Sequence, residues 1–524
     1  MIERTIVAQG EIAGVTTETG TAFLGIPYAA PPVGPLRWKP PQPAASWSGT
    51  FTADSFSGVA HQPLPADNSL YHPGTPPQSE DCLTLNVWTD AADAGEKRPV
   101  MVWFHLGAFI FGSSAGTAGP GGGHVFDGAR LAARGAVVVT VNYRLGRFGF
   151  LAHPWLSAES AHGASGNYGF MDQVAALQWV RDNIAAFGGD AGNVTIVGLS
   201  AGSASCSLHM ASPLSKGLFH RVIASSGGFL GPRATASSGL FDRLLTLEAA
   251  ERRGMQVSDA LGVTDLAALR ALPVEAILSA PIPNEPGPWV MEALGGALGE
   301  GAADTMYPIV DGHALPDTPG AIIAAGRHND VPLLTGSALD DASGLPSIND
   351  LSAFRGYVAA DMGENGDAAL QAYSASDDAS AAIASGDLIA DRVFGWQNWT
   401  WARLAHDHGT APVYYYEWAQ PQPIPEGRYI ERRLGAVHGA EMPHLFGTFD
   451  AYGWNWTDAD RALGDIVARY WINFARDADP NGDGLPSWPQ FEGAAGPAMQ
   501  MRHKPLATPP GRTGRFAVLD RYYA

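Results

Sequence analysis

Short runs of apolar residues, many of them β-branched, recur along the chain, and each run is followed by turn or helix signals. The runs show almost no alternation with polar residues, so strands formed by them are expected to be covered on both faces. Such coverage is typical of parallel sheets that lie between layers of helices. The pattern therefore predicts an α/β protein with a large, mostly parallel central sheet flanked by helices, with strands PVMVWFH (99–105), AVVVTVNY (136–143), NVTIVGLS (193–200), VPLLTGS (331–337) and PVYYYEW (412–418).

Helical spacing appears between the second and third of these runs. In 169–190, apolar residues such as Val174, Leu177 and Ile184 recur on one face, and a glycine pair that begins at Gly188 ends the pattern. This segment predicts a helix that connects two strands of the sheet.

The stretch from about 230 to 310 has a different composition, rich in Ala, Leu and Glu. LTLEAAERRGMQVSDALG (245–262) and DLAALRALPVEAILSA (265–280) predict helices outside the sheet, which would form a cap or flank around a pocket. No repeat and no long polar linker divides the chain, so residues 1–524 are expected to form one domain.

Composition narrows the classes of protein that are possible. Hydrophobic residues make up 46% of the chain and charged residues only 16%, which indicates a globular protein. The net charge of −20 opposes binding to nucleic acid or to an anionic membrane surface. The beginning of the chain has no apolar signal-peptide core, and no stretch is long and apolar enough for a membrane span. With only Cys82 and Cys206, both expected to be reduced and buried, a cytoplasmic location is predicted.

The third run ends in GLSAG, with Ser200 at its centre. A G-x-S-x-G segment between a strand and a helix is typical of the nucleophile elbow of α/β-hydrolases, where small residues allow a turn that exposes the serine hydroxyl. Taken alone, the segment is also compatible with an ordinary turn serine in a glycine-rich chain.

A nucleophilic serine needs a base, an acid that orients the base, and donors for the oxyanion. The loop GAVHGAEMPHLFG (435–447) places His438 among small residues, although a single histidine is more often a core or surface residue. WFHLGAF (103–109) follows a strand, so the N–H groups of Gly107 and Ala108 are candidate donors together with that of Ala201.

These loops lead to a family resemblance. The chain resembles the type B carboxylesterases, which include bacterial para-nitrobenzyl-ester hydrolases and the cholinesterases. The resemblance extends over nearly the whole chain, and it is carried by FLGIPYAAPPVGPLRW (23–38), SEDCLTLNVW (79–88), VNYRLGRFGFL (141–151), GNYGFMDQVAALQWVRDNIAAFGGD (166–190), SPLSKGLFHRVIASSG (212–227), YPIVDG (307–312) and WINFARDADPNGDGLPSWPQF (471–491). It implies the α/β-hydrolase fold.

By position, the resemblance implies that Ser200 is the nucleophile and His438 the general base and then acid. The family's acid lies in a G-x-x-x-D-E-G loop, and the matching GSALDDA (336–342) has Asp341 where a Glu is usual. Because Asp is one methylene shorter than Glu, either this loop lies closer to His438 or neighbouring Asp340 takes the role. Asp341 is the favoured acid and Asp340 the alternative. Ser226 matches a serine that hydrogen-bonds the acid in the family.

Two departures from the family pattern concern the substrate. Leu199 replaces a buried Glu before the nucleophile, which argues against a choline ester, and Glu441 then needs another partner, a water or neutralisation. Leu106 replaces the first glycine of the oxyanion loop and is expected to reshape the pocket floor. The family also implies an ion pair between Arg37 and Glu80.

The resulting hypothesis is a serine carboxylic-ester hydrolase that acts on a small to medium, neutral or hydrophobic ester. It needs no cofactor or metal, binds a small-molecule ester, and is a monomer or a small homo-oligomer. Two alternatives stay open: hydrolysis of a carbamate or amide by the same residues, and a catalytically silent binding protein.

Three other features carry less weight. D-x-D-x-N-G (477–482) resembles the start of an EF-hand loop but has Trp488 at the twelfth position. The glycine-rich stretch 116–124 lacks the Lys-Ser/Thr of a phosphate loop. Trp396 and Trp399 lie at helical spacing, where aromatic residues belong more often to the core than to a pocket.

Overall fold

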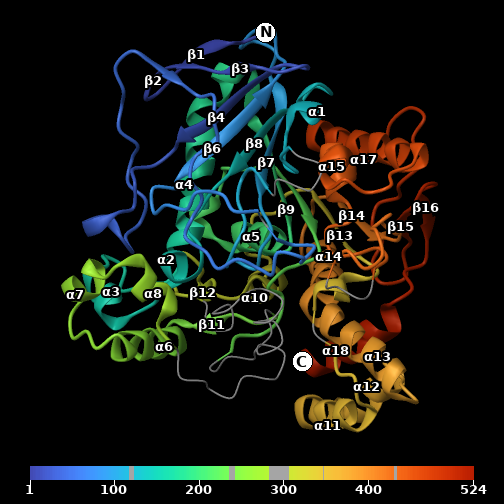
Figure 1. The fold of residues 1–524 in the computed structure, drawn as a ribbon. Coiled ribbons are helices and arrows are strands. Elements are labelled where there is room, and N and C mark those ends of the chain that lie inside the picture. Colours follow the sequence, from blue (N-terminus) through green and yellow to red (C-terminus); the bar gives the residue numbers. More distant parts are fainter. Residues whose placement is uncertain (73, 117–122, 235–241, 282–305, 346, 430–433) are drawn as a thin grey trace.

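The computed structural model describes residues 1–72, 74–116, 123–234, 242–281, 306–345, 347–429 and 434–524. An eleven-stranded sheet runs through the middle of the molecule (Figure 1). In spatial order its strands are β16 (Leu506–Thr508), β15 (Ala498–Met501), β14 (Val413–Trp418), β13 (Leu333–Ala338), β10 (Arg221–Ser225), β9 (Gly189–Leu199), β7 (Arg98–Phe104), β8 (Val137–Val141), β6 (Thr84–Thr89), β4 (Thr21–Pro27) and β3 (Val15–Thr16).

The centre of this sheet is parallel. Every pairing from β8 through β7, β9, β10, β13 and β14 to β15 is parallel, whereas the pairings at the two ends are antiparallel. All five predicted runs are strands of the sheet: β7, β8, β9, β13 and β14. The prediction of a large, mostly parallel sheet is therefore confirmed.

Both faces of the sheet are buried, as the unbroken apolar runs require. Along β7, Val100 and Val102 belong to one hydrophobic cluster, while Met101 and Trp103 belong to another on the opposite face. The first cluster includes side chains of α4 (Tyr168–Asn183), α5 (Ala201–Ala211), α10 (Pro319–Ala324) and α14 (Trp396–His408). The second includes side chains of α1 (Ala129–Ala132), α15 (Met442–Phe446) and α17 (Asp458–Asp477).

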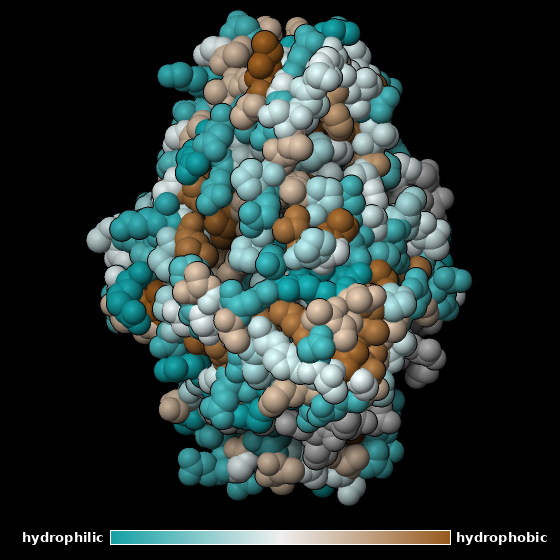
Figure 2. Space-filling model, turned by 90° about the vertical axis from the view of Figure 1, so that its left-hand side faces the viewer, coloured by the Kyte–Doolittle hydropathy of each residue, from teal (hydrophilic) through white to brown (hydrophobic). Residues whose placement is uncertain are grey.

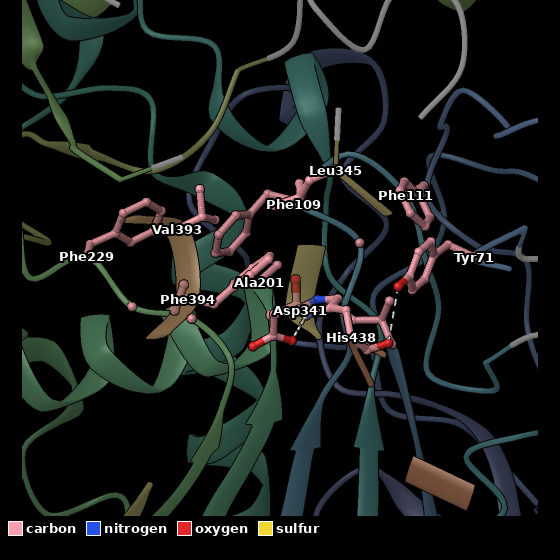
Figure 3. Close-up of a pocket in the computed structure, with 17 residues that line it drawn as sticks. Tyr71, Phe109, Phe111, Ala201, Phe229, Asp341, Leu345, Val393, Phe394 and His438 are labelled. Carbon is pink, nitrogen blue, oxygen red and sulfur yellow. Dashed lines mark hydrogen bonds and ion pairs between the residues drawn. The ribbon is translucent and has the colours of Figure 1, made fainter. Parts of the chain in front are cut away.

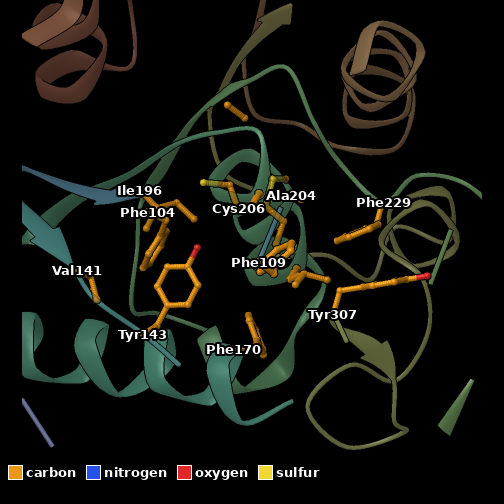
Figure 4. Close-up of a cluster of buried hydrophobic side chains, with 14 of the residues drawn as sticks. Phe104, Phe109, Val141, Tyr143, Phe170, Ile196, Ala204, Cys206, Phe229 and Tyr307 are labelled. Atoms are coloured by element: carbon orange, nitrogen blue, oxygen red, sulfur yellow. The ribbon is translucent and has the colours of Figure 1, made fainter. Parts of the chain in front are cut away.

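Part of the first cluster lies around α5 (Figure 4). There Phe104 and Ile196, from neighbouring strands, belong to the same core as Phe170 of α4 and Cys206 of α5. Helix α4 is the predicted connection from β8 to β9, and it continues as the 3-10 helix η2 (Ile184–Phe187) before Gly188 takes a left-handed conformation. The core thus supports the helix that follows Ser200.

Helices α6 (Leu247–Ala260), α7 (Leu266–Ala271) and α8 (Val274–Ser279) lie beside the sheet, where the sequence predicted helices outside it (Figure 1). Parts of two predicted features, residues 235–241 and 282–305 of the cap and 117–122 of the glycine-rich stretch, lie outside the described residues. Further elements are β1 (Arg4–Val7), β2 (Gly10–Ala13), β5 (Thr50–Thr52), β11 (Leu245–Thr246), β12 (Ile309–Val310), η1 (Gly34–Leu36), α2 (Gly146–Phe150), α3 (Pro154–Glu159), η3 (Pro213–Ser215), η5 (Asp341–Gly344), α11 (Leu351–Met362), η6 (Gly363–Asn365), α12 (Gly366–Ala372), α13 (Asp378–Ala390), the π-helical turn η7 (Asp391–Gly395), α16 (Phe449–Tyr452) and α18 (Thr513–Tyr523).

The face shown in Figure 2 carries separate hydrophobic patches among mostly hydrophilic residues. Within the described ranges, no helix has the length and apolarity needed to cross a bilayer. Cys82 and Cys206 are both buried free thiols.

The topology gathers several loops at one edge of the sheet, because the carboxyl ends of parallel strands meet there. The loop of Gly107 follows β7, Ser200 follows β9, Ser226 follows β10 and Asp341 follows β13.

Candidate active site

Ser200 lies in a tight turn between β9 and α5. Its backbone has φ 59° and ψ −120°, a conformation that costs a non-glycine residue free energy and is concentrated at functional sites. A Cβ atom added at Gly198 would lie 2.2 Å from the backbone of Gly202, and one added at Gly202 would lie 1.9 Å from the carbonyl oxygen of Phe104. The two glycines are therefore required by close packing, and the strained turn lifts Ser200 to the wall of a cavity.

Two candidate oxyanion donors lie in the loop after β7. Gly107 has φ 121° and Ala108 has φ 54°, and the Gly107 carbonyl accepts hydrogen bonds from the N–H groups of Ile110 and Phe111. In the described part of the chain, the N–H groups of Gly107 and Ala108 donate to no protein acceptor. Both residues line the same cavity as Ser200 and Ala201, so they remain candidate donors to a ligand in that cavity.

His438 and Asp341 are paired through their side chains. Nδ1 of His438 lies 2.9 Å from Oδ1 of Asp341, and the other carboxylate oxygen accepts hydrogen bonds from the Ser226 hydroxyl at 2.9 Å and the Ala338 N–H at 3.1 Å. Asp341 is only 1% exposed. Because a carboxylate oxygen can only accept a hydrogen bond, the proton between the two side chains belongs to Nδ1. In the neutral imidazole, Nε2 is then the nitrogen that can accept a proton.

Asp340, the alternative acid, has a different partner. Its Oδ2 accepts a hydrogen bond from the Ala436 N–H at 2.9 Å, and its own N–H donates to the Ala436 carbonyl at 3.1 Å. Asp340 thus holds the backbone of the loop that carries His438, whereas Asp341 contacts the imidazole itself.

Two aromatic rings pack against the imidazole. The ring of Phe394 stacks on that of His438 with centroids 4.2 Å apart and planes inclined by 25°. The ring of Tyr71 meets it edge-on at 6.0 Å, and the Tyr71 hydroxyl donates to the His438 carbonyl at 3.3 Å (Figure 3).

The cavity that contains these residues is predominantly apolar. Its wall consists of Tyr71, Leu106, Gly107, Ala108, Phe109, Phe111, Ser200, Ala201, Ala204, Gly227, Gly228, Phe229, Asp341, Leu345, Val393, Phe394 and His438 (Figure 3). A second cavity adjoins it, and both are lined by Tyr71, Leu106, Phe111 and His438. The second cavity extends to Tyr452 and Trp454.

Much of this aromatic wall was not found from the sequence. Phe109 follows a predicted donor and could have been read from its loop, but Tyr71, Phe229 and Phe394 come from distant segments without a motif. Trp396 and Trp399 belong to the hydrophobic core, as expected for aromatic residues at helical spacing, and neither lines this cavity. The ring of Trp396 stacks on that of Tyr523.

The two departures from the family pattern have separate structural consequences. Leu199 is fully buried in the second hydrophobic cluster, while Leu106 lines both cavities. Glu441 is 1% exposed and accepts a hydrogen bond from the Tyr416 hydroxyl at 3.2 Å, so Tyr416 is the partner that the sequence left open. Burial raises the pKa of Glu441 to about 7, and the nearby Asp341 carboxylate contributes to the rise.

Arg37 and Glu80 form the ion pair that the family resemblance implied, with Nε of Arg37 2.7 Å from Oε2 of Glu80. In the part of the chain that the structure describes, no three His, Cys, Asp or Glu side chains are grouped as metal ligands.

A mostly parallel sheet with a strained serine turn at its carboxyl edge defines an α/β-hydrolase. The carboxylesterase family model matches residues 4–515, so the chain belongs to the carboxylesterase family. It is 33% identical to the fumonisin B1 esterase of Sphingopyxis macrogoltabida and 35% identical to the cocaine esterase of Homo sapiens, each alignment covering 92% of this chain and 83% of the relative.

Solved structures agree with this placement. A PNB esterase has a TM-score of 0.81 and 28% identity, with complete coverage of both chains. A carboxylesterase of Geobacillus stearothermophilus has a TM-score of 0.77 and 30% identity, again over 100% of both chains. The protein is a carboxylic ester hydrolase.

Proposed function

We propose that the protein hydrolyses its ester in two steps through an acyl-enzyme on Ser200. The observation that carries this proposal is the 2.9 Å contact between His438 and Asp341, on the wall of the same cavity as Ser200. With Nδ1 engaged by the carboxylate, Nε2 is the nitrogen that takes the serine proton. In this proposal Asp341, rather than Asp340, orients the imidazole.

In the first step, Oγ of Ser200 attacks the ester carbonyl carbon and its proton passes to His438. Negative charge develops on the carbonyl oxygen, where the N–H groups of Gly107, Ala108 and Ala201 stabilise it. The bond from the carbonyl carbon to the alcohol oxygen then breaks, and His438 returns the proton to the leaving alcohol.

In the second step, water attacks the acyl carbon while His438 accepts a proton from it. The bond between the acyl carbon and Oγ breaks, and Oγ of Ser200 regains a proton from His438. The products are one carboxylic acid and one alcohol, and the protein returns to its starting state.

The walls of the cavity support a neutral or hydrophobic ester of small to medium size. Apart from Asp341 and His438, which face each other, the residues that line it carry no charge. Leu199, in the place of the family's Glu, adds no carboxylate that would attract a cationic substrate. The relatives named above also support an ester substrate, because each of them is named as an esterase.

Steady-state kinetics on p-nitrophenyl esters of increasing acyl length test the proposal, with a matched aryl carbamate and the Ser200→Ala variant alongside. We expect turnover of the esters that is lost in Ser200→Ala. Faster turnover of the carbamate than of any ester would favour the carbamate alternative.

A serine-reactive phosphonate separates an enzyme from a silent binding protein. We expect it to label the wild type and not Ser200→Ala. Absence of labelling in folded wild-type protein would contradict the proposed nucleophile and favour the binding protein.

A further inference from the structure

Phe394 has an unusual position relative to the catalytic imidazole. Its ring is 7% exposed and lies almost parallel to that of His438, with a centroid separation of 4.2 Å. The Tyr71 ring meets the imidazole edge-on, with the two ring centroids 6.0 Å apart. Two aromatic rings therefore contact the imidazole, and among the described residues it is Phe394 whose ring stacks on its face.

The local backbone explains why Phe394 reaches this position. Residues 378–408 form a nearly continuous helix, which is interrupted by one π-helical turn, η7 (Asp391–Gly395), between α13 and α14. Such single π-turns often mark functional sites. In this turn Val393 and Phe394 line the active-site cavity.

The two charged residues of the same turn have partners in other segments of the chain. Asp391 accepts a hydrogen bond from the Tyr373 hydroxyl at 3.0 Å. Arg392 is 1% exposed and donates to Asp242 at 2.9 Å and to the Tyr522 hydroxyl at 3.0 Å. Breaking the buried ion pair between Arg392 and Asp242 is costly, so this pair anchors the turn.

We propose that Phe394 is a positioning residue for His438. The stacked ring restricts rotation of the imidazole, so that Nδ1 stays on Asp341 and Nε2 faces Ser200. Its π-face also stabilises the positive charge that the imidazole gains during each proton transfer. This inference rests on the proposed function of His438 as the base.

Kinetics on p-nitrophenyl acetate test the proposal, because its small acyl group makes little use of the cavity wall. For Phe394→Leu we expect kcat to fall about tenfold, with KM nearly unchanged, because the stacking interaction and the imidazole geometry are both lost. Phe394→Tyr retains an aromatic face and should recover most of the lost kcat.

Two other variants serve as comparisons. Phe491→Leu removes a buried ring that packs on Trp399 in the core and does not line the cavity, so it should show only the effect of general packing loss. Val393→Ala enlarges the same cavity from the same turn and should change KM for longer acyl chains.

The low-field proton resonance of the hydrogen bond between His438 and Asp341 gives a readout that does not depend on turnover. We expect it in the wild type, in Phe394→Tyr and in Val393→Ala, and expect it broadened or lost in Phe394→Leu. Wild-type kcat and an unchanged resonance in Phe394→Leu would overturn the positioning role, even if ester hydrolysis requires Ser200. Conversely, loss of the resonance in Phe394→Leu would support the role even if the wild type hydrolysed no ester.

Discussion

Oδ1 of Asp341 lies 2.9 Å from Nδ1 of His438, although the two residues are 97 positions apart in the chain. The remaining carboxylate oxygen is held by the Ser226 hydroxyl and the Ala338 N–H. These contacts fix the direction of the carboxylate. In this geometry the shorter Asp side chain makes the contact with the histidine that a Glu makes in the family pattern.

Removing the charge of Asp341 should nearly abolish turnover. We expect Asp341→Asn to lower kcat by about 10⁴-fold, because an amide can present an N–H to Nδ1 and favour the wrong tautomer. Asp340→Asn is the matched control, since an Asn oxygen can still accept the hydrogen bond from Ala436. Steady-state rates on one p-nitrophenyl ester decide the matter, and a large loss in Asp340→Asn with none in Asp341→Asn would reverse the assignment.

The oxyanion loop should not tolerate a side chain at Gly107. A Cβ atom there would lie 1.9 Å from the Phe111 carbonyl oxygen, so the loop must move and its donors move with it. For Gly107→Ala we expect a loss of roughly 10²-fold or more in kcat, as for removal of one oxyanion donor. Gly217→Ala is the control, because Gly217 also has a positive φ (75°) but a Cβ atom added there would meet no other atom within 4 Å. Equal rates for Gly107→Ala and Gly217→Ala would argue against this loop as the oxyanion site.

Shortening Leu106 should enlarge both cavities that its side chain lines. Leu106 lines both, so Leu106→Ala is expected to favour esters with bulky apolar alcohol groups over methyl esters of the same acid. Each additional buried CH₂ contributes about 0.8 kcal/mol, and a shift of roughly tenfold in the ratio of kcat/KM values is expected. A ratio that does not change would show that the second cavity takes no part in binding the alcohol.

Glu441 should make stability depend on pH. Its pKa is raised to about 7 by burial, from an ordinary value of 4.5, so the folded chain binds its proton more tightly than the unfolded chain does. The corresponding stabilisation is complete below pH 4.5 and is lost as the pH rises through 7, with a total of about 3 kcal/mol.

Thermal unfolding of wild type and Glu441→Gln at pH 5.5 and pH 8 tests this dependence. Gln is neutral at both values and keeps an oxygen for the Tyr416 hydroxyl. We expect the fall in Tm between the two pH values to be smaller in Glu441→Gln than in the wild type. The same fall in both proteins would assign the pH dependence to other groups.

The sequence by itself determined the elements that local pattern encodes. Unbroken apolar runs specify strands buried on both faces, and the two glycines around Ser200 specify a turn that only small residues can form, so the sheet and the elbow could be predicted. The loop of His438 could also be predicted, because small residues flank the histidine and because the family resemblance extends over nearly the whole chain.

Only the tertiary structure decided which of two adjacent aspartates contacts the imidazole and which side chains surround it. Asp340 and Asp341 differ by one position, and the backbone direction after β13 turns one towards Ala436 and the other towards His438. The stacking of Phe394 depends on a π-helical turn within a long helix. The periodicity of the sequence predicts the helix but does not indicate where such a turn interrupts it. Contacts between segments so far apart follow from the order of strands in the sheet, and local periodicity contains no information about that order.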